Sequence, residues 1–322
     1  MTSIPRSTVL KGLAGGIAAS AVPAIARAQS ANTVRIAGVF SDLFAEPFYA
    51  KDAGAFTKAG FDVSAISLNN AGAVAAAIGG GSLELGTGDL ISGVNAINAG
   101  VPIVLVAGGG LYSERTDGGS TILAVAADSP IKTPKDLVGK SIGVPTLVGL
   151  TTACLRAWLP AHGIAVDSVK LIEIPQSAAL PALQHGTMDA GLLSEPFVTF
   201  AKNSVRSVGS PFDAAADLTA NKVFCVSVWY AAKSWFEADP ARSRRVVQAI
   251  YDTARWANSH RDDTFNILVR DGKLDADQAR GMQRTTYATT LVPDLIQPVI
   301  TIGTNNKMFQ KPVDVASLIT KA

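Results

Sequence analysis

The chain has 322 residues, of which 48% are hydrophobic and 17% charged, and its formal net charge at pH 7 is +2. This length suits about two domains of ordinary size, and the composition is that of a compact globular protein and excludes a disordered one. Two cysteines cannot form a zinc framework, and the three histidines show no metal-ligand spacing.

The first 28 residues have the three parts of a secretory signal peptide. Arg6 and Lys11 give a basic start, a moderately apolar run follows, and the triplet ending at Ala28 offers the small residues that a signal peptidase reads. We predict cleavage after Ala28 and therefore a periplasmic protein. The stretch PRSTVLKGLAGG is similar to a twin-arginine signal with Ser7 in place of the second arginine, so the export route stays open.

Removing this segment changes the net charge of the chain. Residues 1–28 carry three basic residues and no acid, so the net charge becomes −1 in the mature protein. A nearly neutral chain without Lys/Arg clusters does not favour nucleic acid as a partner. No later apolar run is long enough to span a bilayer.

The first part of the mature chain alternates short apolar strands with helices. Strands are expected at 33–40, 61–68, 83–89 and 101–107, and helices at 47–59, 71–81 and 91–100. This alternation predicts a parallel sheet flanked by helices.

The same alternation returns after residue 120. Strands are expected at 120–128, 140–144, 169–175 and 189–196, helices at 149–163 and 177–186, and a long strand at 222–231. We therefore predict one lobe from residues 29–120 plus 230–322, and a second lobe, 121–229, inserted into it. Strands near 121–126 and 224–229 are the expected crossings. From Ser234 onward the pattern is helical, and this tail should pack on the first lobe because it cannot form a sheet layer of its own.

The two cysteines, Cys154 and Cys225, lie on a predicted helix and a predicted strand. An exported chain could pair them. Two small buried residues are favoured instead, because free cysteine is among the most buried residue types.

Five segments together resemble a known family: GSLELGTGD, INAGVPIVLVAG, DLVGKSIGV, LRAWLPAHGI and ALPALQHGTMDAGLLSEP. In this order they resemble periplasmic solute-binding proteins of ABC importers with the type II architecture. Within that group the chain is similar to the nitrate/sulfonate/taurine and thiamine-precursor binding family (SsuA/THI5-like, NMT1-like). The resemblance implies a two-lobed α/β fold, a small-molecule solute, permease and ATPase subunits as partners, and a monomeric receptor.

Ligands of parallel sheets bind beyond the carboxyl ends of the strands, where helix N-termini present free N–H groups. This rule selects candidate ligand-binding residues in both lobes: Ser41, Asp42, Phe44, Glu46, Asn69, Asn70 and Asp89 in the first, and Thr146, Thr151, Thr152, Gln176, Ser194 and Glu195 in the second.

The candidate set allows two ligand classes. Its neutral hydroxyls and amides, beside helix N-termini, suit a carboxylate, a sulfonate or nitrate. Its four acids, with no Lys or Arg at the strand ends, suit an amine or an aminopyrimidine. An aromatic wall for a ring could come from Phe40, Phe44, Phe48 and Tyr49, although aromatic residues before a helix more often belong to the core. The ligand class therefore stays open.

No catalytic set can be assembled from the sequence. There is no Ser–His–Asp order and no metal spacing, so we expect neither an enzyme nor a bound cofactor or metal. The expected function is that of an extracytoplasmic receptor whose lobes close on a solute. The alternative is a sensory module that presents the solute to a membrane receptor.

Overall fold

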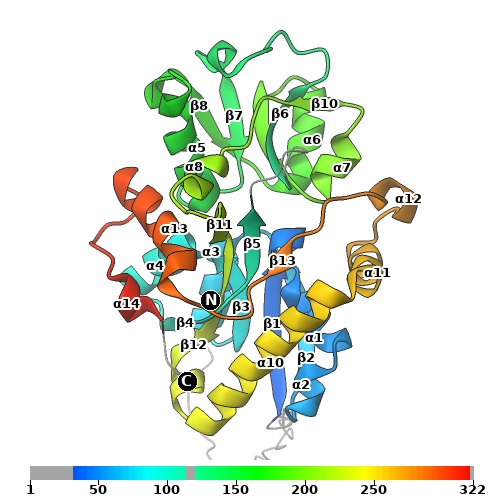
Figure 1. Cartoon of the computed structure of the whole chain (residues 1–322), viewed down its shortest axis with the longest axis vertical. Coiled ribbons are helices and arrows are strands. Elements are labelled where there is room, and N and C mark those ends of the chain that lie inside the picture. Colours follow the sequence, from blue (N-terminus) through cyan, green and yellow to red (C-terminus); the bar gives the residue numbers. More distant parts are fainter. Residues whose placement is uncertain (1–31, 114–119, 320–322) are drawn as a thin grey trace, which may run out of the picture. The chain divides into compact units, whose positions relative to one another are not determined.

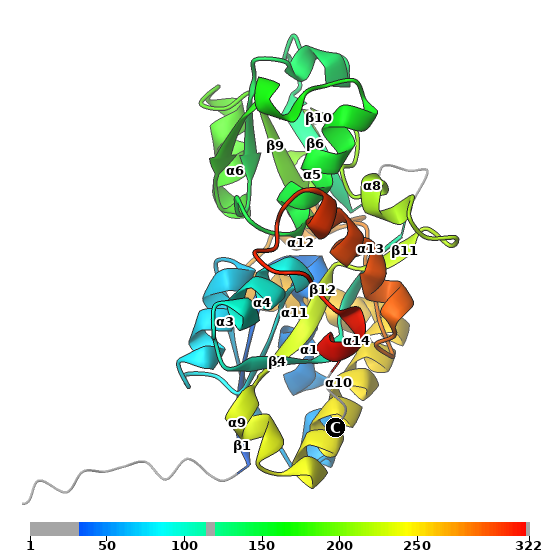
Figure 2. The same ribbon diagram turned by 90° about the vertical axis from the view of Figure 1, so that its left-hand side faces the viewer.

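The computed structural model describes residues 32–113 and 120–319, so the predicted signal peptide lies outside the described residues. Two five-stranded sheets, each flanked by helices, form two lobes (Figures 1 and 2). Within the described residues, no helix combines the length and the apolar character that crossing a membrane requires.

The first sheet has the strand order β2-β1-β3-β12-β4. Its strands are β1 (Thr33–Val39), β2 (Asp62–Leu68), β3 (Leu85–Asp89), β4 (Ile103–Gly108) and β12 (Ser227–Ala232). β1 pairs in parallel with β2 and β3, whereas β12 runs antiparallel between β3 and β4. Every residue of β3 is buried, as a central strand covered on both faces requires.

Short helices connect the strands of this sheet and cover it. They are α1 (Glu46–Asp52), α2 (Ala55–Lys58), α3 (Ala71–Gly79) and α4 (Leu90–Asn98). Gly93 in α4 has a packing reason, because a Cβ there would come within 2.4 Å of the Tyr230 ring on β12. The glycine therefore lets α4 lie directly against the sheet.

The second sheet has the order β10-β6-β9-β7-β8. Its strands are β6 (Thr121–Ala126), β7 (Ser141–Val144), β8 (Lys170–Glu173), β9 (Ala190–Ser194) and β10 (Val205–Ser207), and its helices are α5 (Leu150–Ala161), α6 (Gln176–Gln184) and α7 (Phe197–Ala201). β7 is parallel to β8 and β9, and β6 is antiparallel to β9 and β10. Both sheets are thus mixed. The alternating pattern predicts the parallel half of each, whereas the antiparallel pairs formed by β12 and β6 were not expected.

A small third sheet lies where the chain passes between the lobes (Figure 1). It consists of β5 (Gly110–Ser113), β11 (Val223–Cys225) and β13 (Thr286–Tyr287), in the order β11-β5-β13. The single strand expected at 222–231 is therefore divided at Val226, and its two parts belong to different sheets. β13 lies in the tail that was expected to hold helices only.

The helical tail comprises α10 (Pro240–Ser259), α11 (Arg261–Gly272), α12 (Ala276–Ala279), α13 (Pro293–Asn305) and α14 (Val315–Leu318), after α8 (Asp213–Ala216) and α9 (Lys233–Glu237) earlier in the chain. α10 packs on α1, α2 and β4 of the first lobe, as predicted. α13 contacts both α4 of the first lobe and α5 of the second. One hydrophobic cluster consequently includes Leu90 and Ile91 of α4, Leu150 and Cys154 of α5, and Ile300 of α13.

Candidate functional site

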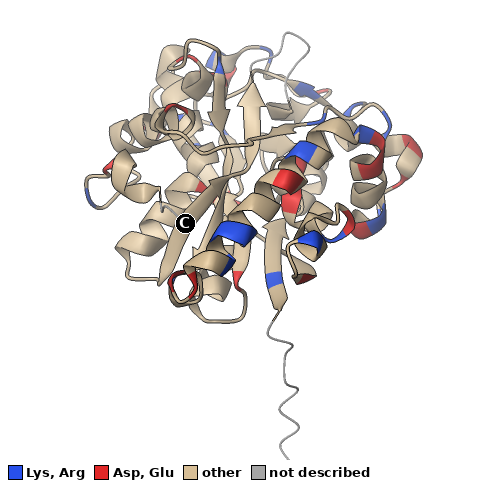
Figure 3. Ribbon diagram, turned by 60° about the horizontal axis from the view of Figure 1, so that its bottom comes forward, with Lys and Arg blue, Asp and Glu red and all other residues tan. Residues whose placement is uncertain are grey.

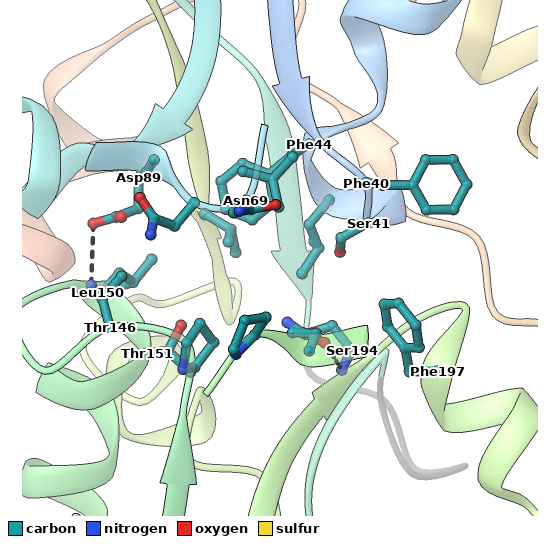
Figure 4. A pocket seen from close by; sticks show the side chains of 18 of the residues that line it. Phe40, Ser41, Phe44, Asn69, Asp89, Thr146, Leu150, Thr151, Ser194 and Phe197 are labelled. Carbon is teal, nitrogen blue, oxygen red and sulfur yellow. Dashed lines mark hydrogen bonds between the residues drawn. The ribbon is translucent and has the colours of Figure 1, made fainter. Parts of the chain in front are cut away.

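A cavity lies where the carboxyl ends of the strands of both large sheets meet (Figure 4). The loops after β1, β2 and β3 form one wall, and those after β7, β8 and β9 form the other. Nine of the thirteen predicted residues line this cavity: Ser41, Phe44, Asn69, Asn70, Asp89, Thr146, Thr151, Gln176 and Ser194. The remaining four, Asp42, Glu46, Thr152 and Glu195, are buried in other surroundings.

Asp42 does not reach the cavity because its carboxylate pairs with Arg284 behind the first wall. Arg284 Nε donates to Asp42 Oδ1 at 3.0 Å, and the backbone N–H of Thr285 donates to Oδ2. Burial lowers the pKa of Arg284, but Asp42, Tyr49 and Tyr287 together raise it by more, and the pKa lies above its ordinary value. Arg284 is a cation close to a predicted strand end that the sequence analysis did not identify, and its charge is neutralised by the buried Asp42.

Glu46 is fully buried under the first sheet, at the start of α1. Trp229 Nε1 donates to its Oε2 at 3.0 Å, and among the described residues Oε1 has no hydrogen-bond partner. Burial raises the pKa of this carboxyl well above its ordinary value. The pocket lining does not include Glu46, so its carboxyl group does not contact a ligand in the cavity.

Glu195 and Thr152 form hydrogen bonds within the protein, Glu195 to both a neighbouring residue and the C-terminal tail. Glu195 Oε1 accepts from Thr199 Oγ1 at 3.0 Å and from the backbone N–H of Gln283 at 3.1 Å. Burial raises the pKa of Glu195. Thr152 donates its hydroxyl to the carbonyl of Thr146. Neither side chain faces the cavity.

Asp89 is the one predicted acid that lines the cavity, and its carboxylate is already satisfied by the protein. Oδ1 accepts from the backbone N–H groups of Ser92 at 3.0 Å and of Leu150 at 3.1 Å, and Oδ2 accepts from Ser92 Oγ at 2.6 Å. Burial raises the pKa of Asp89 above its ordinary value, although these hydrogen bonds oppose the shift. Asp89 therefore caps α4 in its own lobe and the start of α5 across the cavity (Figure 4).

The rest of the lining is neutral. Amides and hydroxyls of Asn69, Thr151, Gln176 and Ser177 alternate with apolar side chains, and the described lining residues include no Lys, Arg or His. Such a pocket recognises a ligand by hydrogen bonds and apolar contact, without an ion pair to a side chain.

The structure adds two aromatic lining residues that strand-end reasoning missed, Phe197 and Phe212. Phe197 is the first residue of α7 and directly follows the strand expected at 189–196, so its place beyond a strand end was an available signal. Phe212 comes from the segment that returns to the first lobe, and no local pattern marks it. Figure 4 shows Phe197 at the side of the cavity where Phe40 also lies, away from Asp89.

Both cysteines are free and buried, and neither is among the lining residues. Burial raises the pKa of the Cys225 thiol to about 12 and that of the Cys154 thiol still further. Neither is a thiolate at neutral pH, which removes the simplest nucleophile for covalent catalysis.

The whole fold is similar to those of several solved structures. The periplasmic aliphatic sulphonate-binding protein SsuA from Escherichia coli aligns with a TM-score of 0.69 at 20% identity, covering 91% of this chain and 93% of that chain. The alkanesulfonate-binding protein SsuA from Xanthomonas axonopodis pv. citri, bound to MOPS, aligns with a TM-score of 0.73 at 15% identity, covering 90% and 99%. The desulfurization enzyme DszB aligns with a TM-score of 0.59 at 17% identity, covering 89% and 96%. At these identities the likeness shows the fold alone.

A comparison with curated protein sequences finds no match. A family model does match, over residues 43–264, which include β2 to β12 and contain all lining residues except those at the end of β1. This match covers more than half of the chain. The protein belongs to the NMT1/THI5-like family.

Proposed function

We propose that this protein is the extracytoplasmic solute-binding component of an ABC uptake transporter. The observation that carries the proposal is the cavity between the strand ends of two lobes, lined mainly by neutral hydrogen-bonding and aromatic side chains. A solute that contacts both walls stabilises the arrangement in which they face each other, and a membrane permease can then recognise this arrangement.

Membership of the NMT1/THI5-like family and the fold of the sulfonate-binding proteins support this proposal. We further propose that residues 1–28 are a cleaved export signal and that the mature protein is periplasmic. Its two lobes would divide near residues 120 and 230. The protein would act as a monomer, together with a permease and an ATPase.

Binding is favoured over catalysis by the chemistry of the lining. The only ionisable side chain among the described lining residues is Asp89, which the chain itself saturates with three hydrogen bonds. No group there is prepared to act as a base or nucleophile. On the face drawn in Figure 3, the charged residues of α10, α11 and α12 mix both signs, which does not favour a nucleic-acid partner.

Native mass spectrometry of the protein purified from the periplasm of its own host tests this proposal. We expect a non-covalent small-molecule adduct that is lost on unfolding, and X-ray scattering should show compaction when this molecule is returned to the stripped protein. An adduct that leaves as a chemically altered product would contradict a pure binding role. Scattering that stays unchanged on tight binding would contradict closure.

The same preparation separates import from sensing. If a permease and an ATPase reconstituted from neighbouring genes take up the released solute only when this protein is present, the role is import. If uptake does not depend on the protein, the import role is wrong.

A further inference from the structure

Four helices of at least nine residues begin at the cavity, and three of them have a side-chain acceptor at their N-terminus. Asn70 Oδ1 accepts from Ala73 N–H at the start of α3, and Asp89 serves both α4 and α5. α6 begins after Pro175, and none of the side chains that the structure describes caps it. Its first residue, Gln176, lines the cavity together with Pro175 and Ser177.

The partial charges of the four helix N-termini and the carboxylate of Asp89 do not balance, and an excess of positive charge remains at the cavity. A helix N-terminus carries about half a positive charge, so the carboxylate of Asp89 is balanced by the α4 and α5 termini that it caps. The α3 terminus is capped by a neutral amide, and the α6 terminus is uncapped. About one positive charge in total therefore remains at α3 and α6, and among the described lining residues no further acid is present to compensate it.

A second observation also points to a ligand beside α6. Ser41 is 1% exposed, lines the cavity, and its hydroxyl has no hydrogen-bond partner among the described residues. Figure 4 shows this hydroxyl facing the cavity from the wall opposite Ser194. The backbone N–H of Ser194 donates to Gln176 Oε1 at 2.8 Å, which fixes the Gln176 amide at this point and leaves its Nε2 as a donor. A buried hydroxyl without a partner is costly unless a ligand or water satisfies it.

We propose that the N-terminus of α6, with Ser41 Oγ and Gln176 Nε2, binds a singly charged oxyanion of the ligand, of the carboxylate or sulfonate type. The inference rests on the proposed receptor function and specifies the ligand class for that site. Helix and neutral donors hold the anion without a cationic side chain. The apolar body of the ligand lies against Phe44, Phe197 and Phe212.

Three probes that share one ring and differ in their head group test this assignment. Benzoate and benzenesulfonate carry the oxyanion, and benzamide is the neutral analogue of benzoate with nearly the same shape. Calorimetric or NMR titrations at pH 7 should show that at least one anion binds about tenfold or more tightly than benzamide. Whichever of benzoate and benzenesulfonate binds more tightly shows whether the subsite prefers a carboxylate or a sulfonate.

Two lining variants then locate the anion within the cavity. Ser41→Ala should lower the affinity for the better anion by about tenfold and that for benzamide by less than about threefold. Thr151→Ala is the matched control, because it removes a lining hydroxyl at α5, whose N-terminus Asp89 already fills. It should leave the ratio of anion to benzamide affinity unchanged.

Each possible result bears on the proposal. Equal affinity for anions and benzamide, a larger effect from Thr151→Ala than from Ser41→Ala, or no binding of any probe at millimolar concentration would overturn the α6 assignment. The receptor function is judged separately, by the adduct found in native mass spectrometry, so it can survive such a result. A co-purified cation or uncharged molecule would overturn the ligand class and leave the receptor function intact.

Discussion

Asp89 Oδ1 accepts the backbone N–H of Leu150 at 3.1 Å, although the two residues begin helices on opposite walls of the cavity. Gly149 occupies the N-cap position of α5 and has no side chain to offer. A Cβ at Gly149 would come within 2.5 Å of Thr146 Oγ1. One carboxylate thus serves two helix starts, and the hydrogen bond between them joins the lobes beside the hydrophobic contact of α4 with α5.

Replacing Asp89 with alanine should cost about twice as much stability as removing an ordinary cap. Loss of one helix cap costs about 1 kcal/mol, and Asp89→Ala removes two caps, one of which is also the contact between the lobes. We expect a decrease of about 2 kcal/mol or more in the free energy of unfolding, measured by urea denaturation at pH 7. Asp239→Ala is the control, because Asp239 caps α10 alone by accepting from Arg242 N–H. Equal losses in the two variants would show that the bond to Leu150 contributes nothing.

The buried pair of Asp42 and Arg284 ties the tail of the chain to the first loop. Arg284→Met leaves Asp42 as a buried acid without its cation, and breaking a buried pair in this way costs about 3–5 kcal/mol. We expect a loss of that size in urea denaturation at pH 7, because Asp42 keeps only neutral donors from Tyr49 and Thr285.

The double variant Asp42→Asn with Arg284→Met separates charge from packing. Because it removes both charges together, it should recover at least half of the loss. A double variant as unstable as Arg284→Met alone would mean that lost packing of the arginine, and not the unpaired charge, causes the effect.

Glu46 should make the stability of the protein depend on pH. Burial raises its pKa in the folded state well above the ordinary value, so the folded protein holds a proton that the unfolded chain releases. Its contribution is therefore fully present below the unfolded pKa and is lost as pH rises towards the folded value, by up to about 1.4 kcal/mol per pH unit.

Glu46→Gln tests this dependence because glutamine keeps the acceptor for Trp229 Nε1 and cannot ionise. Urea denaturation between pH 5 and pH 8, run in parallel on both proteins, should show a decline in the parent that is weaker in the variant. Parallel curves would assign the pH dependence to other groups, such as Glu195, whose pKa burial also raises.

The repeated strand–helix pattern was sufficient to predict the architecture, because hydrophobic periodicity and glycine stops act over a few residues. α3 and α6 begin within one residue of the predicted positions. β13 is only two residues long, Thr286–Tyr287, and it pairs with β5 far away in the sequence. No local pattern could have marked it.

For the candidate site, the sequence likewise predicted which segments take part but not how their side chains pair. The predicted strand ends located nine lining residues, because the carboxyl ends of parallel strands all lie at one edge of their sheet. The rule could not tell which acids were free. Asp42 meets its cation 242 positions away, and Asp89 is satisfied by Leu150 from the other lobe. The acids that seemed to argue for a cationic ligand are therefore partnered within the protein, which leaves the neutral donors to decide the ligand class.

A capping residue placed on α6 should compete with an anionic ligand for the same N–H groups. Pro175 has φ −59° and ψ 144°, a backbone conformation in which aspartate can act as an N-cap. In Pro175→Asp the new cap adds about 1 kcal/mol of stability, which the lost rigidity of proline largely offsets. Urea denaturation should therefore show a change below about 1 kcal/mol, whereas the affinity for benzoate, or for benzenesulfonate if that anion binds better, should fall at least tenfold relative to benzamide.

Pro175→Asn distinguishes charge from occupancy, because asparagine caps a helix nearly as well as aspartate but carries no charge. It should reduce anion affinity less than Pro175→Asp does. If the two variants weaken anion binding equally, the attraction of the α6 terminus for negative charge is not what holds the ligand, and the anion must lie elsewhere. If neither variant changes it, the ligand does not use the first turn of α6 at all, and the unpartnered hydroxyl of Ser41 needs another explanation.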